Sequence, residues 1–224
     1  MPLRVTLALL TAVLGLLAGP VRAAGFAAGS DYVLIQPPQP THVAAGKVEV
    51  LEVFSYGCPA CNTFQPTMER LKHALPPNAE LAYLPAAFSV AEDWPMFQRA
   101  FLTAQILGIA AKTHQAMFDA VWQPGGELAT FDAARNLKRP QPSIEDAARF
   151  YARVGGVKAE TFLATARSFS VDMKMKAADA QILAMQIPST PSIVVAGKYR
   201  IVEPHMDQLA ELVRFLIAKE AAGH

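Results

Sequence analysis

The chain has 224 residues, 52% of them hydrophobic, which is enough to form one good core. Its 20 Lys and Arg residues nearly balance 19 Asp and Glu residues, so no basic excess is available to hold nucleic acid or an anionic membrane. Two cysteines are too few for a scaffold stapled by disulfides.

The N-terminus has the pattern of a secretory signal peptide. After a short positively charged start, residues 5–18 carry no charge, and a break with small residues follows. We predict a signal peptide over residues 1–23 that is cleaved after Ala23, with Ala24 as the next choice. An uncleaved membrane anchor is the alternative, although the apolar run is short for a span of about 20 residues. Cleavage would remove two arginines and no acid, leaving 18 basic against 19 acidic residues.

The first part of the exported chain contains strands, turns and one helix. Residues 31–35 predict a short edge strand, which the prolines at 37–40 bring to an end. Residues 47–55 predict a buried central strand. Residues 62–75 predict a helix, and residues 80–84 predict a further short strand.

Cys58 and Cys61 lie between the predicted central strand and the helix. A Cys-x-x-Cys pair at such a turn places the first sulfur at the helix N-terminus, where unpaired N–H groups and the helix dipole favour a thiolate. This is the electrostatic arrangement of a dithiol–disulfide redox catalyst. A structural zinc site needs about four ligands, and the five histidines are scattered, so we predict no metal ion and no organic cofactor. A structural disulfide stays open, although so small a loop would stabilise the fold poorly.

From residue 92 to residue 186 the pattern becomes helical, and its methionine and aromatic stripes predict core packing. The predicted features are an N-cap at Asp93, a helix over 112–123, a break at 124–126, a capping box at Ser143 and Asp146, and one long helix over 161–185. Residues 191–202 then predict a β-hairpin, and residues 205–218 a terminal amphipathic helix. The order of these elements predicts an α/β fold with a helical insertion.

Two motifs together resemble the DsbA family of periplasmic thiol:disulfide interchange proteins. Residues 50–61 read Val-Leu-Glu-Val-Phe-Ser-Tyr-Gly-Cys-Pro-Ala-Cys, and residues 187–199 read Ile-Pro-Ser-Thr-Pro-Ser-Ile-Val-Val-Ala-Gly-Lys-Tyr. The resemblance implies a thioredoxin fold, a central mixed sheet flanked by helices, built from residues 24–91 and 187–224. Residues 92–186 would be an all-helical subdomain inserted into it.

The resemblance also implies catalytic roles for the cysteines. Cys58 is similar to the family's exposed nucleophile and Cys61 to its buried partner, and together they would form the redox-active disulfide. Pro59 and Ala60 would form the active-site turn between them. The best-studied members carry Pro-His in this turn, so we expect a higher pKa for Cys58 and a less oxidising disulfide in this chain.

Three further residues take roles from the same resemblance. Pro191 resembles the cis-proline that turns the backbone of Thr190 towards the sulfurs, so that an extended substrate segment can pair with it. Glu52 is similar to a buried acid that accepts a proton as Cys61 reacts. The sequence pattern leaves open the alternative that Glu52 points outward from a sheet edge.

The resulting functional prediction is a periplasmic dithiol oxidase that donates its disulfide to newly exported proteins with cysteine thiols. The resemblance implies a DsbB-type membrane partner that reoxidises it, and we expect a monomer. Two alternatives stay open: a reductase or isomerase of the same fold in the same compartment, and an exported peptide-binding chaperone that does not depend on its thiols.

Overall fold

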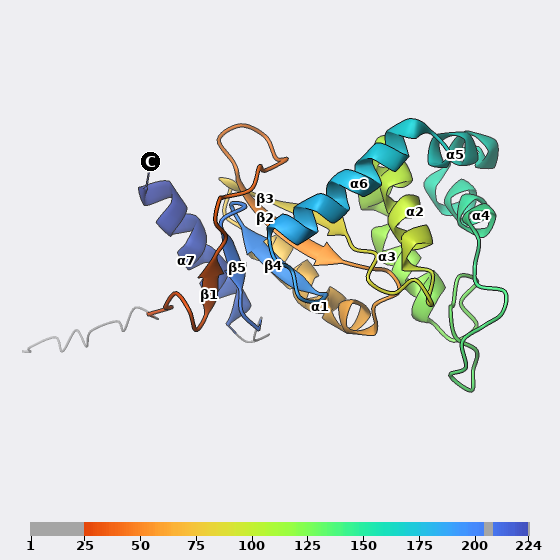
Figure 1. The fold of residues 1–224 in the computed structure, drawn as a ribbon, viewed down its shortest axis with the longest axis horizontal. Coiled ribbons are helices and arrows are strands. Elements are labelled where there is room, and N and C mark those ends of the chain that lie inside the picture. The colour runs from red at the N-terminus through yellow and green to blue at the C-terminus, as the bar shows by residue number, and fades with distance from the viewer. Residues whose placement is uncertain (1–24, 204–207, 224) are drawn as a thin grey trace, which may run out of the picture.

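A computed structural model describes residues 25–203 and 208–223, which form a five-stranded sheet with helices on both faces (Figure 1). The strands are β1 (Tyr32–Leu34), β2 (Val48–Phe54), β3 (Ala79–Pro85), β4 (Ser192–Val195) and β5 (Tyr199–Ile201). The helices are α1 (Pro59–Ala74), α2 (Trp94–Ile106), α3 (Ala110–Trp122), α4 (Ile144–Gly155), α5 (Ala159–Ala166), α6 (Phe169–Ala184) and α7 (Leu209–Ala222).

The sheet has the strand order β1-β5-β4-β2-β3. Strands β2 and β3 run parallel, with Glu52 opposite Tyr83, whereas β4 is antiparallel to both of its neighbours. Strand β1 lies at the edge, as predicted, and β2 lies inside the sheet between β4 and β3. Because a parallel pair needs a long crossover, α1 connects the end of β2 to the start of β3.

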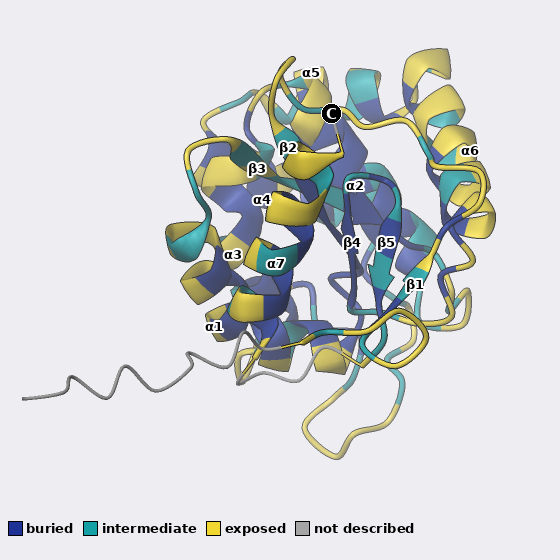
Figure 2. Cartoon of the chain, turned by 90° about the vertical axis from the view of Figure 1, so that its left-hand side faces the viewer, coloured by how far each residue is buried: buried dark blue, intermediate teal, exposed yellow. Residues whose placement is uncertain are grey.

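Different helices cover the two faces of the sheet. On one face, α1 and α7 bury apolar side chains against alternate residues of β2 and β4. The members of that layer include Phe64, Met68, Leu71, Leu212, Val213 and Leu216. The other face of the sheet is covered by α6. Leu51 and Val53 of β2 pack there against Ala178 and Ile182 of α6 and against Met185, which directly follows that helix. Figure 2 shows the strands in the buried interior and the exposed sides of the helices facing outward.

Helices α2–α5 gather beyond one end of the sheet (Figure 1), and α6 returns from them to the sheet. Their core is continuous with the end of β2, because Phe54 and both cysteines belong to the same buried cluster as Phe101 and Phe118. The five helices α2–α6 lie between β3 and β4, where the insertion was predicted. Since α6 packs on the sheet as well as on α2, the division at residues 92 and 186 stays a prediction.

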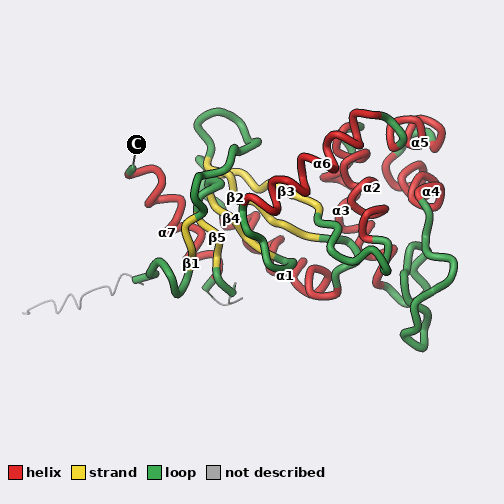
Figure 3. Tube along the Cα trace, in the orientation of Figure 1, coloured by secondary structure: helices red, strands yellow, loops and turns green. Residues whose placement is uncertain are grey.

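The single long helix predicted over residues 161–185 is wrong. Helix α5 ends at Ala166 and α6 begins at Phe169, with Ser168 as its N-cap accepting a hydrogen bond from the backbone N–H of Val171 at 3.4 Å. Apolar residues continue through the break, so periodicity does not reveal it, but a serine side chain can satisfy N–H groups at a new helix start. Figure 3 shows the two helices meeting at an angle.

Other helix ends match the predictions only in part. The capping box of Ser143 and Asp146 is present. Asp93 does precede α2, but its φ of 54° turns the backbone left-handed and its side chain caps nothing. Helix α1 begins at Pro59, earlier than predicted, because proline fits the first helical position.

Two predictions fall wholly or partly outside the described part of the chain. The signal peptide at residues 1–23 lies outside it entirely, and so does the predicted start of the last helix at residue 205. Within residues 25–203 and 208–223, none of the helices combines the length and apolar character that crossing a bilayer requires.

Candidate redox-active site

Cys58 is the N-cap of α1, in an extended conformation with φ −85° and ψ 118°. Its sulfur accepts a hydrogen bond from the backbone N–H of Cys61 at 3.4 Å, and its carbonyl accepts the first helical bond from Asn62 at 3.1 Å. Pro59 occupies the first helical position, where a missing N–H costs nothing. The helix N-terminus therefore directs its unpaired N–H groups at the Cys58 sulfur.

Both cysteines are free thiols and both are buried. Cys58 is 4% exposed and Cys61 is not exposed at all. The expectation of an exposed Cys58 is therefore wrong in absolute terms, although Cys58 is the more accessible of the two. Part of its cover is the loop at Thr190, whose backbone oxygen lies 3.4 Å from the Cys58 sulfur.

The two thiols differ strongly in acidity. A hydrogen bond from the Cys61 thiol lowers the pKa of Cys58 to about 6, helped by the Thr190 side chain and the backbone N–H groups of Cys61 and Ala60 and opposed by burial. Burial raises the pKa of Cys61 well above its usual range, and the hydrogen bond to Cys58 raises it further. At neutral pH, Cys58 is a thiolate and Cys61 keeps its proton.

Pro191 follows a cis peptide bond, as predicted for the loop that faces the sulfurs. A groove of about 700 Å³ runs beside this loop. Its lining comprises Ala60, Thr63 and Phe64 of α1, Pro188, Ser189, Thr190 and Pro191 of the loop, Ser192 at the start of β4, and Arg200, Ile201, Val202 and Glu203 around the end of β5. The loop thus offers backbone groups to a ligand directly beside the Cys58 sulfur.

Glu52 lies in β2 with no exposed surface, and neither of its carboxylate oxygens has a hydrogen-bond partner among the described residues. Burial raises the pKa of Glu52 to about 8, and the negative charge of Cys58 adds to the shift. Strand β2 is an interior strand, so the alternative that Glu52 points outward from an edge is wrong. Glu52 is a neutral acid held in the interior near the cysteines.

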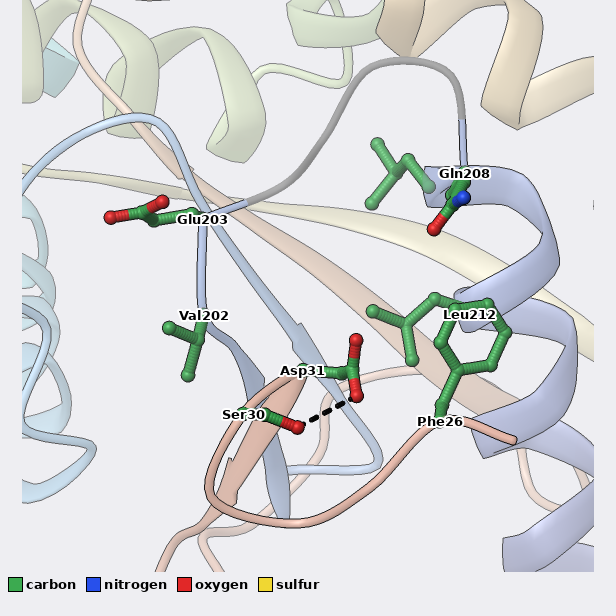
Figure 4. A pocket seen from close by; sticks show the side chains of 8 residues that line it. Phe26, Ser30, Asp31, Val202, Glu203, Gln208 and Leu212 are labelled. Atoms are coloured by element: carbon green, nitrogen blue, oxygen red, sulfur yellow. Dashed lines mark hydrogen bonds between the residues drawn. The ribbon is translucent and has the colours of Figure 1, made fainter. Parts of the chain in front are cut away.

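A second, smaller cavity of about 40 Å³ lies between the N-terminal segment, the end of β5 and α7 (Figure 4). It shares Val202 and Glu203 with the groove. Figure 4 shows the hydrogen bond from the Ser30 hydroxyl to the carboxylate of Asp31, and it shows the carboxylate of Glu203 pointing away from Asp31. Across the described ranges, no group of three or more His, Cys, Asp or Glu side chains is arranged to hold a metal ion.

Known proteins with the same arrangement are thiol:disulfide interchange proteins. The chain is 33% identical to DsbA of Pseudomonas aeruginosa over 201 residues, which cover 88% of this chain and 87% of that protein. It is 35% identical to DsbA of Azotobacter vinelandii over 175 residues, covering 77% and 72% of the two chains. The crystal structure of the oxidoreductase DsbA from Xylella fastidiosa matches with a TM-score of 0.75 and 31% identity, over 88% of this chain and 98% of that one. No protein-family model matches the chain.

The chain belongs to the DsbA family of thiol:disulfide interchange proteins. Its mixed sheet and inserted helices are the thioredoxin fold of that family, as predicted. Membership makes it a thiol:disulfide oxidoreductase, and Cys58 and Cys61 are the only cysteines it has for that chemistry.

Several residues around this DsbA-family site were not expected from the sequence. Tyr56 and His114 are hydrogen-bonded to each other beside the cysteine turn, and Trp94 and Trp122 contact the same turn. His114 lies in an apolar helical stripe, where sequence alone does not distinguish it from an ordinary core residue. Only the folded chain brings these side chains together.

Glu52→Gln is expected to remove part of the pH dependence of stability. Glu52 has a pKa of about 8 in the folded protein against an ordinary value of 4.5. Folding therefore favours its protonated form: the stabilisation is complete below about pH 4.5 and is lost as the pH rises towards about 8. Relative to the variant, the wild-type unfolding free energy should fall by up to about 1.4 kcal/mol per pH unit in this window. Urea unfolding of the disulfide form, whose sulfurs do not titrate, measures this.

Glu49→Gln is the matched control. Glu49 is buried in the same strand on the opposite face, and its raised pKa is partly offset by a hydrogen bond from the His42 backbone N–H at 2.7 Å. Glu49→Gln should reduce the pH dependence of the unfolding free energy less than Glu52→Gln does. Identical pH profiles for wild type and Glu52→Gln would contradict the assignment of Glu52 as a buried neutral acid.

Proposed function

We propose that this protein is a periplasmic dithiol oxidase that donates a Cys58–Cys61 disulfide to newly exported proteins. The observation that carries the proposal is the opposite acidity of two cysteines three positions apart, with the acidic one at the helix N-terminus facing a cis-proline loop. Stabilising the Cys58 thiolate stabilises the reduced protein, and a stable reduced form makes the disulfide oxidising.

The exchange takes place in two substitutions at sulfur. A substrate thiolate attacks the Cys58 sulfur, a substrate–Cys58 bond forms, and the Cys58–Cys61 bond breaks with its electron pair passing to Cys61, which takes up a proton. A second substrate thiolate then attacks the substrate sulfur of this mixed disulfide, and Cys58 leaves as a thiolate. The substrate is oxidised by two electrons and the protein is reduced by two. The low pKa of Cys58 makes it the better leaving group.

Glu52 is proposed to handle the proton of Cys61. Being neutral and buried, it can give a proton to the Cys61 sulfur as that sulfur leaves, and it can accept the proton when Cys61 reacts during reoxidation. Once Glu52 is ionised, its charge raises the pKa of Cys61, which supports the transfer of a proton between the two groups.

The groove beside Thr190 and Pro191 is proposed to bind an extended stretch of the substrate. Backbone groups of the loop can pair with it as with an added strand, while Phe64 and Pro188 provide apolar contact. Phe88, near Trp94 and 47% exposed, extends the apolar surface on the insertion side.

The family and the sequence support the proposed setting of the reaction. Export through the predicted signal peptide would bring the protein to the periplasm, where thiols of arriving chains are oxidised. A DsbB-type membrane partner would reoxidise the dithiol, and the protein would act as a monomer, with residues 92–186 inserted into the thioredoxin-like part formed by 24–91 and 187–224.

The reduction potential decides between an oxidase and a reductase. Equilibration with glutathione buffers, read as the fraction of disulfide, should give about −120 to −180 mV, the range from DsbA-type oxidants to protein disulfide isomerase. The lowered pKa of Cys58 is the physical reason. A value near about −270 mV, where thioredoxin lies, would make the protein a reductase instead.

Serine substitutions test the roles of the two sulfurs and the chaperone alternative. With Cys61→Ser, the Cys58 thiolate can attack the disulfide of an oxidised substrate: a Cys58–substrate bond forms and one substrate thiolate leaves. Residue 61 can no longer attack this mixed disulfide, so substrate-linked protein should accumulate on non-reducing gels. With Cys58→Ser, such adducts and oxidase activity on a reduced model protein should both disappear. The opposite result would be that Cys58→Ser still prevents aggregation and oxidises the model protein at the same rate as wild type. That result would support a peptide-binding chaperone that does not depend on its thiols.

Ala60→His tests why this member differs from those with Pro-His. Ala60 is exposed in the first turn of α1 next to Cys58, so an imidazolium there would stabilise the thiolate. The pKa of Cys58, followed by thiolate absorbance, should fall by about one unit and the disulfide should become more oxidising. Ala60→Asn, polar but uncharged, is the control and should shift the pKa less. An unchanged pKa in Ala60→His would contradict this account.

A further inference from the structure

The turn that leads into the nucleophilic cysteine is attached to the helical insertion at three points. The hydroxyl of Tyr56 lies 2.9 Å from Nδ1 of His114 in α3. The indole Nε1 of Trp122, at the end of the same helix, donates to the backbone oxygen of Tyr56 at 2.8 Å. Gly57 lies so close to Trp94 at the start of α2 that a Cβ on it would be 2.6 Å from the indole Nε1.

These contacts act on residues that directly determine the position of Cys58. Within the turn, the N–H of Cys58 donates to the carbonyl of Ser55 at 3.1 Å, and the N–H of Gly57 donates to the Ser55 hydroxyl at 3.2 Å. The sulfur of Cys58 accepts its N–H bond at 3.4 Å. Because a hydrogen bond weakens as its length and angle depart from the best geometry, a movement of Tyr56 that shifts Cys58 changes how well the helix N-terminus stabilises the sulfur.

The Tyr56–His114 bond joins two uncharged groups. Burial raises the pKa of Tyr56 well above its usual value and lowers the pKa of His114 to about 3. The tyrosine therefore keeps its proton and the imidazole is neutral, and the tautomer of His114 decides which of the two groups donates. The bond does not titrate across the range in which Cys58 does.

His114 is a costly residue for its position. Its ring lies 4.5 Å from that of Tyr83 and 5.0 Å from that of Phe54, measured between centroids, in an aromatic cluster. Its Nε2 is buried without a hydrogen-bond partner among the described residues, and an unpaired buried polar atom costs free energy whether it is a donor or an acceptor. An apolar side chain would avoid that cost, so what the histidine provides is its bond to the turn.

We propose that His114 and Trp122 are positioning residues for the disulfide exchange, which through Tyr56 hold the Cys58 sulfur against the N-terminus of α1. The helical insertion then contributes to the oxidising power of the disulfide without touching substrate. The inference rests on the proposed function, and it adds the means by which the insertion adjusts that same site.

Tyr56→Phe and Trp122→Phe test this, since both keep an aromatic ring. Trp122→Phe removes one hydrogen bond, and Tyr56→Phe removes the bond to His114 together with the interaction of the Tyr56 hydroxyl with Tyr151. Two quantities are measured. The first is the equilibrium constant for reduction, in which the protein disulfide and two glutathione molecules give the protein dithiol and glutathione disulfide. The second is the pKa of Cys58, obtained by titrating its thiolate. Each variant should lower the equilibrium constant for reduction about three- to tenfold, the effect of one lost hydrogen bond, and should raise the pKa of Cys58.

Tyr199→Phe is the matched control. Tyr199 is also buried, and its hydroxyl donates to Glu220 at 3.1 Å, but it lies in β5 against α7. It should lower the unfolding free energy while leaving both readouts as in wild type. If the Tyr56 bond were merely structural, Tyr56→Phe would give the same result as Tyr199→Phe, because the loss of the bond would destabilise the disulfide and dithiol forms equally.

His114→Phe gives a further check, because its effect should not add to that of Tyr56→Phe if both break the same bond. Should His114→Phe fail to fold, the other two variants still decide. Unchanged glutathione equilibria and Cys58 titrations in Tyr56→Phe and Trp122→Phe overturn the inference. A reductase-like potential of the wild type would overturn the proposed function alone, because the comparison between variants and wild type would still stand.

Discussion

The unpaired N–H groups at the start of α1 are the constraint on which the site depends. Every helix begins with such groups, and Cys58, at the end of the turn that joins β2 to α1, occupies the cap that faces them. For Cys58, donors outweigh burial and the pKa falls to about 6. For Cys61, inside the helix, burial dominates and the hydrogen bond to Cys58 raises the pKa further, against a smaller lowering by a backbone hydrogen bond with Ser55. The hydrogen bond between the two thiols, the N–H groups at the helix end and the deeper burial of Cys61 together make two identical side chains chemically different.

Glu52 shows a second consequence of the same placement. An interior strand between two others has no physical use for a carboxyl group, and an apolar residue there would cost less. The acid is held neutral by burial, so near the cysteines the interior holds a proton on Glu52 and another on Cys61 while the Cys58 sulfur is charged. In the proposed exchange a proton is gained or lost at Cys61, and the neutral Glu52 is a buried group that can supply it.

The sequence predicts those parts of the site that depend on neighbours in the chain. The strand, the cysteine turn, the helix and the hairpin after Pro191 are local patterns, and the buried position of Glu52 follows from the apolar strand around it. The contact between Tyr56 and His114 joins positions 58 residues apart, and the groove combines α1 with the end of β5. Such contacts depend on how the insertion packs, and no local pattern contains them. The break at Ser168 was missed for a related reason: a single cap residue outweighed a continuing apolar period.

The low exposure of Cys58 constrains what can react with it. The insertion occupies one side of the cysteine turn through Trp94 and Trp122, and the Thr190 loop covers the sulfur from another. The open space beside that loop is the groove, which the loop at Thr190 and Pro191 lines together with α1 and the end of β5. A flexible, extended segment can bring a cysteine into such a groove and pair with the loop, whereas a cysteine held on a rigid folded surface reaches a buried sulfur less easily. In the proposed reaction, the packing that fixes Cys58 would therefore favour substrates that have not yet folded.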